Sequence, residues 1–86
     1  MIKVSTMNKK QKLNALAKLL EKHGFYFQAD LVLTEEGLDE IGELTKKAYG
    51  DSYERETSEV FGSDYKDLMK LAKSLKIKLP ESVWFD

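Results

Sequence analysis

Near the N-terminus, hydrophobic residues recur with the spacing of one helix face. Between Asn8 and His23 the apolar positions follow an i, i+3, i+4, i+7 pattern, with lysines on the other side. They are Leu13, Leu16, Ala17 and Leu20. Asn8 and Gln11 have the spacing of a capping box, and Gly24 supplies the left-handed residue that closes a helix. The pattern predicts an amphipathic helix over residues 8–23.

Residues 25–33 fit two periods. Read with a period of two, Phe25, Phe27, Ala29, Leu31 and Leu33 alternate with the residues between them, which predicts a strand. Read with a period of 3.6, Phe25, Ala29, Val32 and Leu33 share one face of a short second helix. Periodicity alone leaves both structures open.

Residues 16–31 resemble a helix-turn-helix-hairpin segment that recurs in small phage and bacterial proteins. The stretch carries Leu16-Ala17, a leucine one turn later, Gly24, and then an amide before Ala29-Asp30. In that segment the residues after the glycine are helical, so the resemblance favours a helix over 25–33, and it implies no activity. The aromatic trio 25–27 stands where the segment usually has polar residues, which keeps the strand as the alternative.

A further helix is predicted from Thr34 to Gly50. Thr34 is a good N-cap, and Leu33 and Leu38 are spaced as a hydrophobic staple across it. Acidic residues form the outward face of this helix: Glu36, Asp39, Glu40 and Glu43. Residues 51–62 show no clear period and predict a long loop with at most a short helix.

The C-terminal third combines one clear helix with an apolar end. Ser63 is a suitable N-cap for a helix over 64–75, whose buried side is Tyr65, Leu68, Leu71, Ala72 and Leu75. Residues 76–79 alternate like a short strand, and Pro80 ends it. The apolar residues 83–85 are large enough that we expect them to pack as a lid on helix 64–75.

These elements predict a mainly α fold. We expect a single domain over residues 1–86, a bundle of three to four helices with short strands at 2–4 and 76–79. The alternative is an α+β fold in which 25–33 is a strand of a small sheet. From the length of 86 residues we expect no second domain of ordinary size.

Charge is segregated along the chain, although the net charge is only −1. Residues 1–29 carry six lysines against one glutamate, residues 30–67 carry twelve acids against four bases, and residues 68–86 carry four lysines against two acids. The absence of cysteine fits a reducing compartment. With no apolar run of membrane-spanning length and no signal-peptide pattern, we expect a cytoplasmic protein.

Residues suited to enzyme chemistry are few. His23, the only histidine, falls at a helix C-terminus, where capping accounts for it. The sequence has no calcium-loop pattern, no thiolate ligand and no glycine-rich phosphate loop. We therefore expect a protein that is not an enzyme, with no cofactor, no bound metal and no small-molecule substrate.

Two binding functions follow. The first is a small protein-binding module, an adaptor, inhibitor or accessory subunit of phage-like type. Acidic residues would steer a basic partner and aromatic residues would anchor it: Glu36, Asp39, Glu40, Glu43, Tyr49, Tyr53 and Phe61. The alternative is a nucleic-acid-binding protein in which Lys9, Lys10 and Lys12 contact phosphates, with Tyr26 and Phe27 stacking on bases.

Overall fold

Helices dominate the computed structural model, which describes residues 4–34, 44–46 and 53–85. In those ranges the α-helices are α1 (Lys9–Lys22), α2 (Tyr26–Thr34), α3 (Thr57–Phe61) and α4 (Tyr65–Ser74). The strands are β1 (Leu44–Lys46), β2 (Tyr53–Glu56) and β3 (Ser82–Phe85), and single 3-10 turns cover η1 (Val4–Thr6) and η2 (Gly62–Asp64). The predicted small, mainly helical fold with short strands is confirmed.

Helix α1 forms as its sequence pattern predicts. The Asn8 side chain accepts a hydrogen bond from the Gln11 backbone N–H, and the Gln11 side chain accepts one from the Asn8 backbone N–H, both at 2.9 Å. Residue 23 is the C-cap, and Gly24 follows with a φ of 90°. The four predicted apolar positions are buried: Leu13, Leu16, Ala17 and Leu20.

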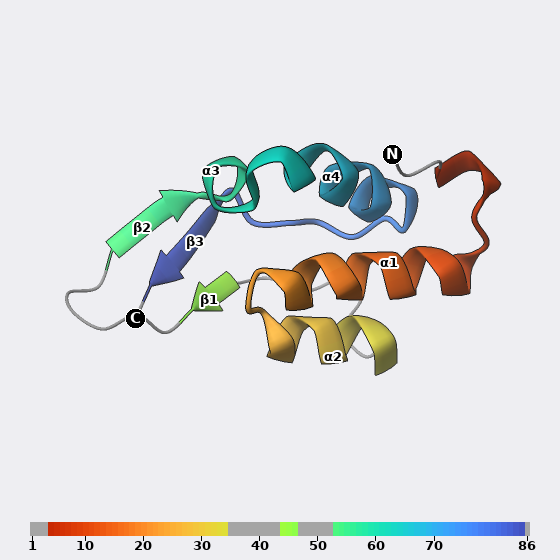
Figure 1. The fold of residues 1–86 in the computed structure, drawn as a ribbon, viewed down its shortest axis with the longest axis horizontal. Coiled ribbons are helices and arrows are strands. Elements are labelled where there is room, and N and C mark those ends of the chain that lie inside the picture. The colour runs from red at the N-terminus through yellow and green to blue at the C-terminus, as the bar shows by residue number, and fades with distance from the viewer. Residues whose placement is uncertain (1–3, 35–43, 47–52, 86) are drawn as a thin grey trace.

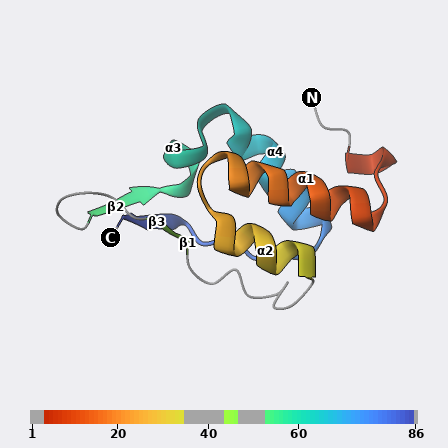
Figure 2. The ribbon, with the colours of Figure 1, turned by 60° about the horizontal axis from the view of Figure 1, so that its bottom comes forward.

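Residues 26–34 are helical, so the strand alternative for 25–33 is wrong. After the turn at Gly24, the Phe25 N–H donates to the Leu20 carbonyl oxygen at 2.8 Å, and α2 starts directly afterwards. Phe25, Ala29 and Val32 are buried, and α2 lies alongside α1 in both ribbon views (Figure 1 and Figure 2). A helix satisfies its backbone groups internally, and this one buries one side on α1.

The sequence predicted Thr34 as the N-cap of a helix, but Thr34 is instead the last residue of α2. Its Oγ1 donates to the carbonyl oxygens of Asp30 at 3.0 Å and Leu31 at 3.2 Å. The predicted helix over 34–50 is also wrong at residues 44–46, which form β1. Its remaining residues 35–43 and 47–50 lie outside the described ranges.

The C-terminal strand is the centre of a three-stranded sheet with the order β1-β3-β2. Strand β3 runs parallel to β1 and antiparallel to β2, with Val83 opposite Leu44 on one side and Arg55 on the other. Val83 and Leu44 are fully buried. The apolar C-terminus is therefore a strand within the sheet and not a lid on helix 64–75, because its backbone pairs with two strands.

The short strands are not where the alternation placed them. Val4 belongs to the 3-10 turn η1, residues 77–80 have no regular secondary structure, and residues 2–3 lie outside the described ranges. Residues 51–62 were predicted as a long loop with at most a short helix; α3 is such a short helix, whereas the strand β2 over residues 53–56 was not predicted. Alternation over three or four residues cannot specify a strand without its partners, which here come from distant parts of the chain.

Helix α4 follows η2, so Ser63 is not its cap. The helix buries Leu68, Leu71 and Ala72, as predicted. The helix ends at Ser74, and in the turn that follows Lys76 has a φ of 59° and the Ile77 N–H donates to the Ala72 carbonyl oxygen at 2.8 Å. This end directs residues 77–80 back along the helices toward the sheet (Figure 1).

One cluster of buried side chains joins the four α-helices, β1 and β3. Helix α1 contacts α2 on one side and α4 on the other, and Leu16 and Leu20 are fully buried between them. Phe61 from α3 and Val83 from β3 belong to the same cluster. The sheet thereby lies at one end of the helical layer (Figure 1).

Candidate interaction surfaces

Phe61, predicted as an exposed partner-binding aromatic, is in the core. It is 2% exposed, and its ring lies 4.8 Å from the His23 ring and 5.4 Å from the Phe25 ring, between centroids. The short helix α3, which the sequence did not predict with these bounds, turns this side chain inward. Phe61 therefore belongs to the hydrophobic core and not to a binding surface.

Tyr53 is at the surface, as the prediction required. Its side chain is 43% exposed, and its ring stacks on Phe85 with centroids 4.6 Å apart and planes 5° apart. The Arg55 guanidinium lies 5.5 Å from the Tyr53 ring centroid. The other predicted residues of this surface, Glu36, Asp39, Glu40, Glu43 and Tyr49, lie outside the described ranges and remain a prediction.

The basic residues of the alternative function do not meet their proposed aromatic partners. Lys9 and Lys10 are exposed at the start of α1, and Lys12 is half-buried. Tyr26 and Phe27 begin α2, at the opposite end of the hairpin. With a rise of about 1.5 Å per residue, the length of α1 separates the two groups by about 20 Å. The hairpin does not combine them into one nucleic-acid site.

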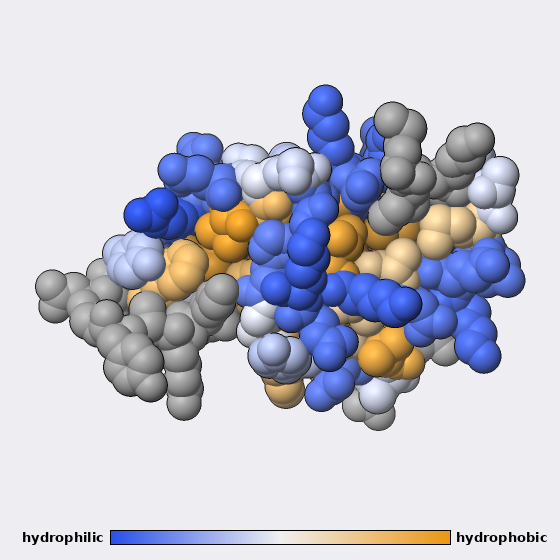
Figure 3. Space-filling model, in the orientation of Figure 1, coloured by the Kyte–Doolittle hydropathy of each residue, from blue (hydrophilic) through white to orange (hydrophobic). Residues whose placement is uncertain are grey.

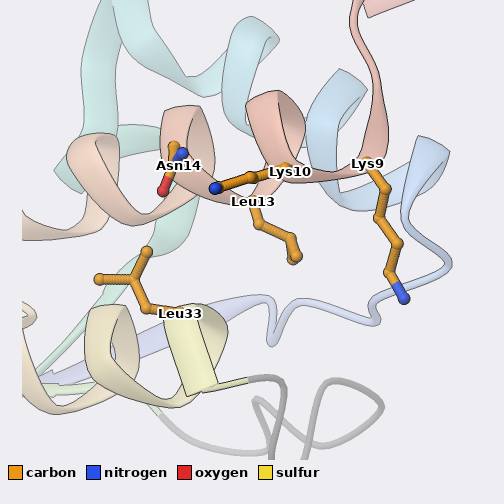
Figure 4. A pocket seen from close by; sticks show the side chains of 5 residues that line it. All are labelled: Lys9, Lys10, Leu13, Asn14 and Leu33. Atoms are coloured by element: carbon orange, nitrogen blue, oxygen red, sulfur yellow. The ribbon is translucent and has the colours of Figure 1, made fainter.

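A hollow lies between the start of α1 and the end of α2. It is lined by Lys9, Lys10, Leu13, Asn14 and Leu33 (Figure 4). A second hollow continues along α1, sharing Asn14 and Leu33 and adding Ala17, Lys18 and Glu21. The lining of the two hollows is a mixture of apolar side chains, an amide, three lysines and one glutamate.

Helix α2 presents apolar side chains to solvent as well as to the core. Tyr26 is 64% exposed, Phe27 70% and Leu33 50%. Tyr26, Asp30 and Leu33 are spaced i, i+4 and i+7, so they lie along one line of the helix, with Phe27 beside it. We call these four residues the α2 face. The sequence already indicated this surface, because residues 25–33 contain more apolar side chains than a helix can bury on one side.

Besides Tyr53, the sheet exposes Trp84, which the sequence predicted to be packed in a lid. Trp84 is 47% exposed, whereas its neighbour Val83 is fully buried, because successive side chains of a strand point to opposite faces. Opposite Trp84 are Glu54 on β2 and Thr45 on β1. The residues on this side of β2 and β3, Glu54, Glu56, Ser82 and Trp84, are called the outer sheet face.

A polar cluster ties the end of α1 to the start of α4. Asp64 Oδ2 accepts hydrogen bonds from Lys22 Nζ and from His23 Nε2, both at 2.9 Å. These bonds hold the pKa of the Asp64 carboxyl below its ordinary value, and the bond from Lys22 has the larger effect of the two. The predicted position of His23 at the helix end is confirmed. Its partner, Asp64, is 41 residues away, so the pairing could be identified only from the tertiary structure.

On the face of the molecule seen in Figure 3, hydrophilic residues predominate, with hydrophobic side chains visible between them. Within residues 4–34, 44–46 and 53–85, no group of three His, Cys, Asp or Glu side chains is placed to hold a metal ion. No helix in the same ranges is long and apolar enough to cross a membrane. Comparison with protein-family models, with curated proteins and with solved structures gave no match.

Proposed function

We propose that this chain is a non-enzymatic protein-binding module, an adaptor, inhibitor or accessory subunit that acts in the cytoplasm. The observation that supports this proposal is the α2 face, where three large apolar side chains on a nine-residue helix are each at least half exposed. A soluble domain of this size gains nothing for its own stability from such exposure. Contiguous exposed apolar side chains are typical of protein interaction sites.

The chemistry of the α2 face defines its partner. Asp30 is the only charged residue of α2, so the surface is apolar with a single negative charge. A helix with this pattern fits an apolar groove on a partner protein, with Tyr26 and Phe27 as anchors and a basic partner residue opposite Asp30. Aromatic anchors of this kind usually carry most of the binding free energy.

Site-specific crosslinking tests the proposal. A photoreactive amino acid at position 27 should capture a partner protein in cells of the native host, whereas the same group at Lys70, exposed on α4, should not. The Tyr26→Ser, Phe27→Ser double variant should lose the same partner in affinity purification while its melting temperature changes little. Equal capture from both positions, or retention of the partner by the double variant, would contradict the α2 face as the binding site.

Nucleic-acid binding remains the second proposal, supported by the exposure of Lys9 and Lys10 at the start of α1. A gel shift at physiological salt would detect it. Binding that disappears when Lys9, Lys10 and Lys12 are changed to Glu would favour this function over protein binding. The separation of these lysines from Tyr26 and Phe27 argues for the first proposal.

A further inference from the structure

The outer sheet face combines an exposed indole with carboxylates that have no ion pair among the described residues. Glu54 lies directly opposite Trp84 across the β2–β3 pair, and Glu56 lies opposite Ser82, so Glu56 is the diagonal neighbour of Trp84. Directly opposed residues have Cβ atoms about 5 Å apart, and diagonal ones are still within reach of long side chains. Both glutamates are exposed, and among the described residues neither has an ion pair.

The two faces of the sheet differ in charge. Arg55, the basic residue of β2, is in register with Val83 and thus on the inner side, where its guanidinium lies near Tyr53 and 4.0 Å from Glu59. The four residues of the outer sheet face, Glu54, Glu56, Ser82 and Trp84, include no lysine or arginine. The outer sheet face is therefore aromatic and negative, and no cation among the described residues pairs with its carboxylates.

We infer that the outer sheet face binds a basic segment of a partner protein, with a lysine or arginine side chain over the Trp84 ring. Tryptophan is the aromatic side chain that attracts cations most strongly, and the attraction adds to the charge of a carboxylate beside the ring. Glu54 is the residue placed to pair with the same cation, and Glu56 is placed to pair with a second one further along the strand. The negative charge of this surface selects against nucleic acids.

This surface is separate from the α2 face and has different chemistry, so the two proposals can fail independently. The α2 face is apolar and fits a groove, whereas the outer sheet face is charged and fits an extended basic segment. A Phe27→Ser variant should leave binding to the outer sheet face unchanged.

A labelled eight-residue peptide of alternating arginine and serine is the probe, with a peptide of alternating glutamate and serine as its control. Fluorescence anisotropy measures peptide binding, and because Trp84 is the only tryptophan, its emission reports contact with the ring directly. We expect saturable binding of the arginine peptide at low salt, a change in Trp84 emission, and no binding of the glutamate peptide.

Matched variants distinguish binding at the outer sheet face from general electrostatic attraction between the peptide and the protein. Glu54→Gln with Glu56→Gln should weaken binding about ten-fold, whereas Glu21→Gln with Asp67→Asn, which removes two carboxylates elsewhere, should change it less than about two-fold. Trp84→Leu should weaken binding about five-fold without changing charge, and Trp84→Phe should restore part of the loss. Far-ultraviolet circular dichroism confirms that each variant is folded.

Three results would overturn the inference. Equal weakening by the two charge-matched pairs would mean diffuse attraction only. Unchanged affinity in Trp84→Leu would remove the indole from the site. Absence of saturable binding to the arginine peptide, or equal binding of the glutamate peptide, would exclude a surface that selects basic segments.

Discussion

The Thr57 hydroxyl donates a hydrogen bond to the Pro80 carbonyl oxygen at 2.7 Å, although the two residues are 23 positions apart. The Thr57 backbone N–H also donates to the Glu81 carbonyl oxygen at 2.8 Å. Thr57 is 1% exposed and begins α3, directly after β2, while residues 80–81 directly precede β3. This pair of bonds fixes the point at which the C-terminal strand enters the sheet.

Replacing Thr57 should show how much its hydroxyl contributes to the free energy of unfolding. Thr57→Val keeps the side-chain volume but leaves the partly buried Pro80 carbonyl without its hydroxyl donor, so we expect a loss of about 1–3 kcal/mol in the free energy of unfolding. Thr57→Ser keeps the hydroxyl and loses one methyl group, at a cost of about 1 kcal/mol. Urea denaturation of both variants measures the difference, and a serine variant less stable than the valine variant would contradict it.

Phe61 and Tyr53 should respond differently to truncation, despite their similar size. Phe61→Ala removes a buried ring that contacts His23 and Phe25, and we expect it to cost about 3–5 kcal/mol. Tyr53→Ala removes a half-exposed ring whose main contact is the cross-strand stack on Phe85, worth about 1 kcal/mol or less. Thermal or urea unfolding of the two variants tests this order, and similar losses would place Phe61 at the surface.

Asp64 should make stability depend on pH in the acid range. Its pKa is lower in the folded chain than in the unfolded chain, so its contribution is present above the unfolded pKa and is lost as the pH falls through the folded pKa. We expect Asp64→Asn to be less stable than the native chain at pH 7, and the difference to shrink below about pH 4. Melting temperatures between pH 7 and pH 2.5 measure this.

Asp67→Asn is the matched control for Asp64, because it removes a carboxylate from the same region that has no ion pair among the described residues. Its difference from the native chain should change less with pH. A difference for Asp64→Asn that stayed constant from pH 7 to pH 2.5 would show that the hydrogen bonds from Lys22 and His23 do not favour the ionised carboxylate.

Neighbouring residues of β3 should differ in their effect on stability. Val83→Ala removes two buried methyl groups at the centre of the sheet and should cost about 2–3 kcal/mol, from the loss of transfer free energy and the cavity left behind. Trp84→Thr keeps a strand-forming residue at an exposed position and should cost about 1 kcal/mol or less. Ending the chain at Pro80 should abolish the sheet, because both other strands pair with β3.

Trp84 fluorescence provides an independent measurement on the native chain. A residue that is 47% exposed should emit near the wavelength of tryptophan in water and be quenched readily by acrylamide, a neutral quencher that the nearby glutamates do not repel. Blue-shifted emission that resists quenching would instead support the buried lid that the sequence suggested.

The helices with strong local signals could be predicted from the sequence. Asn8 and Gln11 cap α1 through bonds between residues three positions apart, and Gly24 ends it, so the information needed is local. The buried positions of α1 and α4 follow from 3.6-residue periodicity for the same reason. For 25–33 the two periods conflicted, and the hairpin with α1 decided in favour of the helix.

Only the tertiary structure decided the sheet and the surfaces built on it. Strand β3 pairs with β1 about 40 residues earlier and with β2 about 30 residues earlier, and a three- or four-residue strand has no stability or recognisable pattern without those partners. The same pairing buries Val83 and exposes Trp84, and α3 turns Phe61 into the core. Composition and periodicity determined that this chain would be mainly helical, whereas exposure of individual aromatic residues depends on which distant segments pack against them.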